Sequence, residues 1–588
     1  MSAAHVEARG TIEIPQGKST ITPTTTTQMD RAVAVVRDHK DAWVKVSVSE
    51  RIALLQTLRK DTLAVSERWV ARACEAKGIT PGTSSEGEEW LGGPFTTLRN
   101  LRLFEASLRA IEKNGTPGIP GKVKSVGQGQ IAAEVFPGDI WDKVFYAGFT
   151  GEIWMEPGVT EQNLGQNQAH IYKTKAAGGT IEGKVALVLG AGNVASIGPM
   201  DVLYKLFVED QVCVLKMNPV NEYLGPFIAE AFQVLVERGY LRIVYGGAVE
   251  GQYLCNHDDI DEIHITGSDK THDAIVFGGG PDGARRKAAK KPANTKRITS
   301  ELGNVSPMII VPGPWSAADR EFQGQNIASS LCNNAGFNCN ATRMLITHKS
   351  WDGRRPLLEE VRATLEKTPR RRAYYPGAED RWNLFVKEHP DAEQYGKARA
   401  DGLPWTLVSD VDPANAEDPC FQTEAFCGLF GETALDASSV VEFIDRAVDF
   451  CNDRMWGTLN ASILIHPASL KDKAVADALE RAIANLRYGS VVINHWPALA
   501  YGFVSTTWGA FPGHEIYDIQ SGAGVVHNSF FFDKPQKTVI RGPFRVFPKP
   551  PWFVTNKNTA EIGRKLAAFE ADPSWLKVPG IVGATLKG

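Results

Sequence analysis

The sequence contains no run of apolar residues that approaches the ~18 needed to cross a bilayer, so we predict no membrane span. Its first residues lack a basic patch followed by an apolar core; we therefore expect no secretory signal and a cytoplasmic protein. The formal net charge is only -4, which is too weak a field to indicate a nucleic acid partner. Together these absences favour an ordinary globular protein.

Cysteine is also scarce. The eight cysteines include no CxxC pair, and no cluster of histidines accompanies them, so we predict no metal site. In a reducing compartment most of them would be small, buried hydrophobic residues. Cys339 differs from the others because small and polar residues surround it in the segment 333–343.

The order of predicted elements indicates two α/β units. A chain of 588 residues is too long for a single core. Residues 1–26 are rich in Thr, Ser, Gly and Pro and are typical of a loosely held arm. Buried strands then alternate with helices from 184 to 265, and the same pattern resumes after Glu301. This alternation predicts two Rossmann-like parallel-sheet domains, one for a cofactor and one for catalysis.

A glycine-rich turn follows the first strand of this alternation. The segment 190–195 matches GxGxxG/A between a strand and a helix, where glycines allow close approach of a pyrophosphate. The next strand ends in Lys216 rather than in the expected acid, and a lysine suits a ribose hydroxyl or a 2′-phosphate. The turn 266–268 closes another buried strand and also suits a phosphate.

Cys339 and Glu301 together suggest covalent chemistry on a carbonyl. The thiolate would attack the carbonyl carbon, and the carboxylate of Glu301, on a short glycine-containing turn, would later deprotonate a water. Combined with a dinucleotide cradle, these groups predict an oxidoreductase that works through a thioester.

Over roughly residues 40 to 530 the sequence resembles the aldehyde dehydrogenase superfamily. Each motif is modest alone, but all of them occur in the order of that family. The matching segments are Asn193, Lys216, 266–268, 301–303, 336–339 with Arg343, 424–428, Asn494 and 521–524.

The resemblance implies NAD(P)-dependent oxidation of an aldehyde to a carboxylic acid. Cys339 would form a covalent thiohemiacetal and then a thioester. The side chain of Asn193, with the backbone N–H of Cys339, would stabilise the oxyanion. Glu301 would activate the water that releases the acid, with a pKa raised toward neutrality by burial.

The resemblance also implies how the cofactor, NAD or NADP, is held. Lys216 would meet the adenosine ribose, and Gly267 and Ser268 would lie beside the pyrophosphate. Glu424 would hold the nicotinamide ribose, with Phe426 packing near it.

The implied architecture includes a β-hairpin arm for oligomerisation, so we expect a homodimer or homotetramer. The predicted boundaries are 1–147 and 184–300 for the dinucleotide-binding domain, 301–525 for the catalytic domain, 148–183 and 526–560 for the oligomerisation arm, and 561–588 for a C-terminal tail.

Three positions depart from the family pattern. Pro219 replaces an acid that would repel a 2′-phosphate, which makes NADP tolerable. Phe337 stands where glutamine is common. Trp508, with the nearby Trp496, predicts an aromatic substrate rim and favours an apolar or aromatic aldehyde.

Two alternatives remain open at this stage. A CoA-acylating aldehyde dehydrogenase or acyl-CoA reductase would transfer the acyl group to CoA rather than to water; such enzymes commonly lack the carboxylate at Glu301. A catalytically silent scaffold of the same fold would not need Cys339, Glu301 and Asn193 together.

Overall fold

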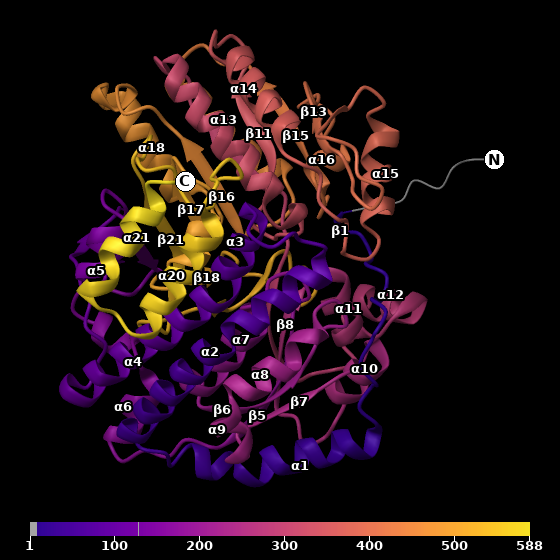
Figure 1. The fold of residues 1–588 in the computed structure, drawn as a ribbon, viewed down its shortest axis with the longest axis vertical. Coiled ribbons are helices and arrows are strands. Elements are labelled where there is room, and N and C mark those ends of the chain that lie inside the picture. The colour runs from indigo at the N-terminus through magenta and orange to yellow at the C-terminus, as the bar shows by residue number, and fades with distance from the viewer. Residues whose placement is uncertain (1–8, 128) are drawn as a thin grey trace.

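Two β-sheets organise the chain in the computed structural model, which describes residues 9–127 and 129–588 (Figure 1). The first sheet has six strands in the order β19-β9-β8-β5-β6-β7, and its neighbours from β9 to β7 are parallel. The strands are β5 (Lys184–Leu189), β6 (Gln211–Lys216), β7 (Leu241–Val244), β8 (Glu262–Gly267), β9 (Arg297–Leu302) and β19 (Gly522–Ala523).

Helices surround this first sheet, and α1 and α7 pack against β5 and β6. The helices of this part are α1 (Thr26–Trp43), α2 (Val48–Lys77), α3 (Ser84–Trp90), α4 (Thr96–Asn114), α5 (Ile140–Phe145), α6 (His170–Ala176), α7 (Ile197–Phe207), α8 (Gly225–Ala231), α9 (Gln233–Glu237), α10 (Ala248–Cys255), α11 (Asp269–Phe277) and α12 (Gly280–Ala288).

Local sequence explains these elements. The four inner residues of β5, Val185 to Val188, are fully buried, as expected for a parallel strand covered on both faces. Thr25 and Gln28 form a capping box at the start of α1, and Gly78 ends α2 in the left-handed conformation. The β/α alternation predicted from the sequence therefore takes the predicted form.

The second sheet has eleven strands in the order β12-β13-β15-β11-β10-β16-β17-β21-β4-β3-β2. They are β2 (Val123–Ser125), β3 (Ile131–Phe136), β4 (Thr150–Met155), β10 (Ser306–Ile310), β11 (Thr342–His348), β12 (Glu393–Tyr395), β13 (Trp405–Val408), β15 (Leu429–Leu435), β16 (Asn460–Leu464), β17 (Ser490–Ile493) and β21 (Pro535–Arg541). Its helices are α13 (Ala317–Cys332), α14 (Arg354–Lys367), α15 (Ala378–Glu388), α16 (Pro419–Gln422), α17 (Val440–Arg454), α18 (Lys473–Asn485) and α19 (Ala498–Gly502).

Two short pairs complete the strands. β1 (Gly10–Thr11) pairs in parallel with β14 (Thr423–Glu424), and β18 (Trp508–Gly509) pairs with β20 (Val525–Val526). None of the helices in the described ranges is long and apolar enough to cross a membrane.

The segments that we predicted as an oligomerisation arm extend the second sheet of their own chain. β21 pairs in parallel with β17 and antiparallel with β4, and β4 pairs with β3. Whether these segments also contact a second chain stays a prediction.

The segment predicted as a C-terminal tail forms α20 (Thr559–Ala571) and α21 (Val578–Thr585), drawn in yellow in Figure 1. Apolar residues of α20 pack with Trp90 and Leu98 in one cluster. The buried carboxylate of Glu570 lies 2.9 Å from the guanidinium of Arg99. The C-terminal helices are therefore part of the packed structure.

Candidate active site

Cys339 lies in a tight loop between α13 and β11. The loop starts with a 3-10 turn (Asn333–Gly336) in which Asn334, Ala335 and Gly336 have φ of 52°, 58° and 80°. A Cβ on Gly336 would stand 2.5 Å from the carbonyl oxygen of Cys427, so only glycine fits there. Three consecutive left-handed residues turn the chain sharply and leave the thiol half-buried. We call the segment 333–340 the nucleophile loop.

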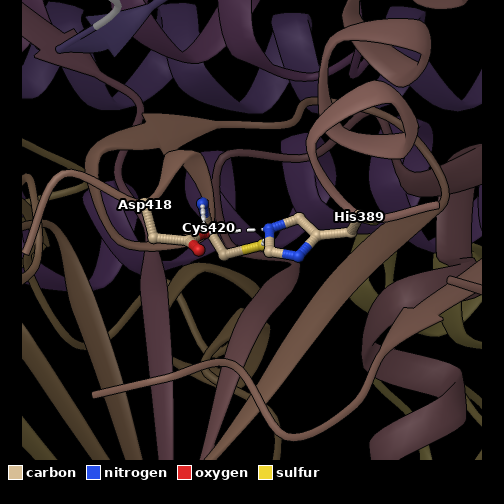
Figure 2. Close-up of side chains that lie close together, drawn as sticks. All are labelled: His389, Asp418 and Cys420. Atoms are coloured by element: carbon tan, nitrogen blue, oxygen red, sulfur yellow. Dashed lines mark hydrogen bonds and ion pairs between the residues drawn. The ribbon is translucent and has the colours of Figure 1, made fainter. Parts of the chain in front are cut away.

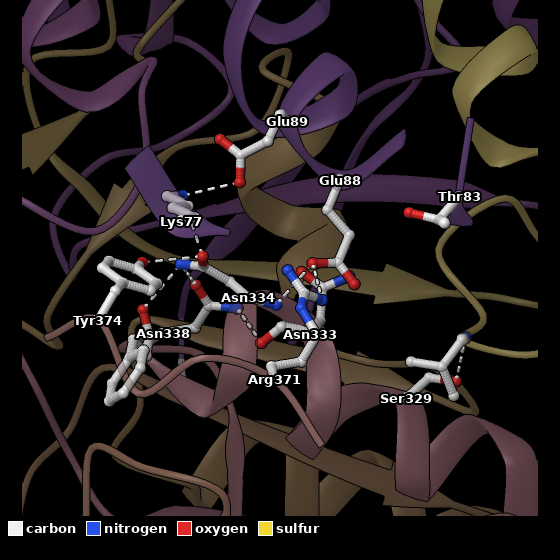
Figure 3. A network of polar contacts seen from close by, with 12 residues as sticks. Lys77, Thr83, Glu88, Glu89, Ser329, Asn333, Asn334, Asn338, Arg371 and Tyr374 are labelled. Atoms are coloured by element: carbon white, nitrogen blue, oxygen red, sulfur yellow. Dashed lines mark hydrogen bonds and ion pairs between the residues drawn. The ribbon is translucent and has the colours of Figure 1, made fainter. Parts of the chain in front are cut away.

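A buried polar network holds this loop from behind (Figure 3). The ammonium of Lys77, at the end of α2, donates to Glu89 at 2.8 Å, to the Asn334 side-chain oxygen at 3.0 Å and to the Asn193 carbonyl at 3.1 Å. The Asn334 amide nitrogen also donates to the Asn193 carbonyl, at 3.0 Å, and the Tyr374 hydroxyl donates to the Asn334 side-chain oxygen at 2.9 Å. These bonds fix the left-handed turn against the first sheet.

Glu301 faces Cys339 from the carboxyl end of β9. Its carboxylate is 3% exposed, and Trp508 Nε1 donates to its Oε1 at 2.9 Å. Burial raises the pKa of Glu301 to about 7, although the Trp508 bond opposes that shift. Burial, together with the charge and hydrogen bonding of Glu301, raises the pKa of the Cys339 thiol well above its usual range. A base that titrates near neutrality therefore stands beside a protonated thiol.

Asn193 reaches the nucleophile loop from the turn after β5. Its side chain is buried, and Nδ2 donates to the carbonyl oxygen of Phe337 at 3.0 Å. An amide nitrogen carries two hydrogens, and the described residues provide no second acceptor for this one. The structure thus brings Asn193, Glu301 and Cys339 together from three separate segments.

Lys216 and Glu424, two predicted cofactor residues, are buried with unused bonding capacity. Burial lowers the pKa of Lys216 to about 8, and no hydrogen bond or ion pair to its ammonium group comes from the described residues. Glu424 has one carboxylate oxygen, Oε1, that is buried without a hydrogen-bond partner. Burial raises the pKa of Glu424 to about 8, with Arg343 opposing the shift.

Of the other predicted cofactor residues, Gly267 and Ser268 lie at the carboxyl end of β8 in the first sheet, and Phe426 follows β14. Gly267 is exposed at the end of β8, and Ser268 caps α11 by accepting from Thr271 N at 3.1 Å. Phe426 has φ of 40° and packs against Phe337, with ring centroids 6.0 Å apart.

The two tryptophans of the predicted aromatic substrate rim are buried. Trp508 and Trp496 are 1% and 5% exposed, and each uses its indole N–H inside the site. Trp508 bonds Glu301, and Trp496 donates to the Asn340 carbonyl at 2.6 Å. Both tryptophans therefore brace the catalytic groups, which removes the sequence argument for an aromatic aldehyde.

Sequence reasoning missed Lys77, Asn334 and Tyr501. The Tyr501 hydroxyl lies 2.7 Å from the Ser196 hydroxyl, close to Cys339 and Glu301, whose charges add to the burial that raises the pKa of Tyr501 well above its usual range. The unusual run Asn333-Asn334-Ala335-Gly336 could have indicated the left-handed turn. The residues around Lys77 in the sequence do not indicate its role, because they form the end of an ordinary helix.

A second cluster of titratable side chains consists of His389, Asp418 and Cys420 (Figure 2). His389 Nε2 is 3.1 Å from Asp418 Oδ1 and 3.7 Å from Cys420 Sγ. Structural zinc sites use four protein ligands, and the described residues supply three here. We describe the cluster as a hydrogen-bonded brace between the end of α15 and α16, just before Glu424.

Comparisons with known proteins agree with this architecture. Residues 206–373 match the sequence model of the aldehyde dehydrogenase family. N-succinylglutamate 5-semialdehyde dehydrogenase from Novosphingobium aromaticivorans is 28% identical over 167 residues, which is 28% of this chain and 32% of that protein. The crystal structure of a putative aldehyde dehydrogenase from Burkholderia cenocepacia superposes with a TM-score of 0.59 at 20% identity, covering 91% of this chain and 97% of the other. Residues 206–373 are therefore similar in sequence to the aldehyde dehydrogenase family, and the chain as a whole shares the fold of solved aldehyde dehydrogenases.

The similarity of fold extends well beyond the region of sequence similarity. Indole-3-acetaldehyde dehydrogenase, solved with NAD+, matches 91% of this chain with a TM-score of 0.56 at 17% identity. The sequence match to the curated relative spans only about a third of that relative's length, 32%. The predicted fold class is confirmed.

Proposed function

We propose that this protein oxidises an aldehyde to a carboxylic acid, with NAD or NADP as electron acceptor, through a thioester on Cys339. One observation carries the proposal. Glu301, with a pKa raised to about 7 by burial, stands against the Cys339 thiol at the edge of a dinucleotide-type sheet. A buried carboxylate of this kind suits a general base at neutral pH.

The residues at the edge of the first sheet, together with Glu424 of β14, fit a dinucleotide. Glu424 Oε1 is a buried acceptor without a partner, which suits a ribose hydroxyl. The unpaired ammonium of Lys216 suits a second ribose or a 2′-phosphate, and Gly267 leaves space for a phosphate group. When bound, the nicotinamide would accept the hydride of the aldehyde.

In the first step Glu301 takes the proton of the Cys339 thiol. The sulfur then adds to the carbonyl carbon of the aldehyde, and the C=O electron pair moves to the oxygen. The free N–H of the Asn193 amide can donate to that oxyanion. One such donor typically lowers the barrier by about 3 kcal/mol.

Once Glu301 has passed the thiol proton to solvent and the hydride has left the substrate, the same carboxylate acts on water in the second step. Glu301 removes a proton, the oxygen attacks the thioester carbon, and the C–S bond breaks to release the carboxylic acid and a thiolate. The Trp508 bond holds one carboxylate oxygen in place, so that the other remains for the water.

Trapping of the acyl-enzyme tests the proposal. Glu301→Gln should keep enough hydride transfer for a burst of reduced nicotinamide, after which the acyl group remains on Cys339, visible by mass spectrometry. Cys339→Ala serves as the control and should show neither signal. A Glu301→Gln enzyme with full steady-state turnover would contradict the assigned base.

The position of Glu301 also disfavours a CoA-acylating enzyme, because transfer to CoA does not require a base for water. Release of free carboxylic acid in the absence of CoA distinguishes hydrolysis of the thioester from transfer of the acyl group to CoA. The aldehyde, the choice between NAD and NADP, the cytoplasmic location and a homodimeric or homotetrameric state stay predictions.

A further inference from the structure

The N-terminal segment crosses the edge of the first sheet where the dinucleotide is proposed to lie. In Figure 1 it runs from β1, beside α15 and α16, down past α11 and α10 to α1. We call residues 9–17 the strap. Its contacts show which part of the cleft each residue covers.

The catalytic end of the strap sits between Glu424 and α11. Gly10 pairs with Thr423, and Thr11 pairs with Glu424. The backbone N–H of Thr11 donates to Asp269 Oδ1 at 3.0 Å, and the Thr11 hydroxyl bonds the same oxygen. The strap therefore lies on the strand that carries Glu424 and on the residue that follows Ser268.

The other end of the strap covers the adenosine side. The side-chain amide of Gln16 lies against Gly247, at the N-terminus of α10, where even a Cβ would collide with it. Gly251, one turn further along α10, lies near the Lys216 side chain; a Cβ there would be 4.0 Å from Lys216 Cε. Gln16 thus stands at the same wall of the cleft as Lys216.

The negative charge at the start of α11 indicates that the cofactor displaces the strap, rather than that the strap covers the bound cofactor. The first residue of α11 is Asp269, and its carboxylate is engaged by Thr11. A pyrophosphate beside Ser268 would lie next to this carboxylate, which Thr11 holds in place, and the two negative charges would repel each other. The strap therefore disfavours a phosphate at this position, because its release frees the Asp269 carboxylate to turn away.

Beyond Thr11 the strap is weakly held. At its N-terminal end Arg9 forms an exposed ion pair with Glu417 at 3.3 Å, and the Arg9 carbonyl accepts from Lys270 at 2.9 Å. From Arg9 to Gly17 only Gly10 and Thr11 are buried, and the remaining residues are half-buried or exposed. Segments with little buried apolar surface open at low free-energy cost. By contrast, the chain just beyond it is anchored, because Glu222 accepts from Ser19 and from Ile21 N at 2.7 and 2.8 Å.

We propose that the strap is an autoinhibitory segment that occupies the dinucleotide cleft, so that NAD or NADP binds only after displacing residues 9–17. This inference rests on the proposed cofactor use. The apparent affinity for the cofactor is then reduced by the fraction of molecules with the strap in place.

Cofactor binding without turnover provides the test. In a Cys339→Ala background, Thr11→Pro removes both bonds to Asp269, and binding of NADH and NADPH is measured by calorimetry. We expect about tenfold tighter binding than in the background protein. Glu13→Pro is the matched control, because it places proline at an exposed position for which the described residues offer no bond, and it should leave the affinity unchanged.

Hydrogen exchange gives a second readout that does not depend on a variant. Saturating NADH or NADPH should speed exchange of the Thr11 amide. Slower or unchanged exchange at Thr11, or equal affinity of the Thr11→Pro and Glu13→Pro proteins, would overturn the strap and leave the proposed function standing. Failure of every variant and of the unmodified protein to bind either nicotinamide would overturn both, whereas cofactor binding by the unmodified protein without oxidation of any aldehyde would contradict the function alone.

Discussion

The Lys77 network behind the nucleophile loop and the cofactor cleft differ in how completely their buried polar groups are partnered. Behind the loop, Lys77 alone makes three bonds, to Glu89, Asn193 and Asn334. In the cleft, Lys216 has no bonded partner among the described residues and Glu424 keeps an unpaired carboxylate oxygen. A saturated network fixes the atoms that react, whereas unpaired groups are retained where a ligand must enter and leave.

Replacing the nucleophile is expected to have the largest effect. Cys339→Ser should lower kcat by about 10^4-fold or more, because the hydroxyl is a far weaker nucleophile beside a base of this pKa. Binding of the cofactor should be unchanged, because different contacts hold the nucleophile loop and the cofactor cleft. Steady-state kinetics and calorimetry check this; loss of cofactor binding would show that the regions are coupled.

Removing the oxyanion donor should come next. Asn193→Ala should lower kcat by about 10^2- to 10^3-fold. KM for the aldehyde should change little, because the lost bond forms mainly in the transition state. A variant that raised KM alone, with kcat intact, would assign Asn193 to substrate binding instead.

Breaking the Lys77 network should lower both the stability of the fold and the rate of turnover. Lys77→Met leaves Glu89 buried without its partner, which should cost about 3–5 kcal/mol in the free energy of unfolding. The double variant with Glu89→Gln should recover part of that loss. Urea unfolding of the single and double variants measures it; equal stability of Lys77→Met and the unmodified protein would show that the network is dispensable.

The smallest effect is expected at Trp508. The indole bond lowers the pKa of Glu301, so Trp508→Phe should shift upward the pH at which thioester release reaches half its maximum. Because Glu301 must be ionised to act as a base, release rises as pH passes through about 7 in the unmodified protein. The matched variant Trp496→Phe should leave this pH profile in place, because its indole bonds Asn340 rather than Glu301.

The sequence predicts only some features of the nucleophile loop and of the cofactor cleft. Strand-helix alternation from 184 to 265 predicts the first sheet, because each strand and its crossover are local in the chain. The order of motifs led to Asn193, Glu301 and Cys339, which the structure brings together; their roles stay a proposal. The network through Lys77 and the strap were not predicted, since both depend on contacts between segments more than 100 residues apart, as in Lys77 with Asn193 and Thr11 with Asp269.

The place of β21 in the eleven-stranded sheet has a consequence for synthesis of the chain. β21 (Pro535–Arg541) is the sole link between β4 on one side and β17 on the other in the described strand order. On the ribosome, β2, β3 and β4 therefore emerge early and can pair with one another, but the other edge of β4 has no partner until residue 541 has left the exit tunnel. Such a long interval with an unpaired strand edge favours slow maturation and reliance on chaperones.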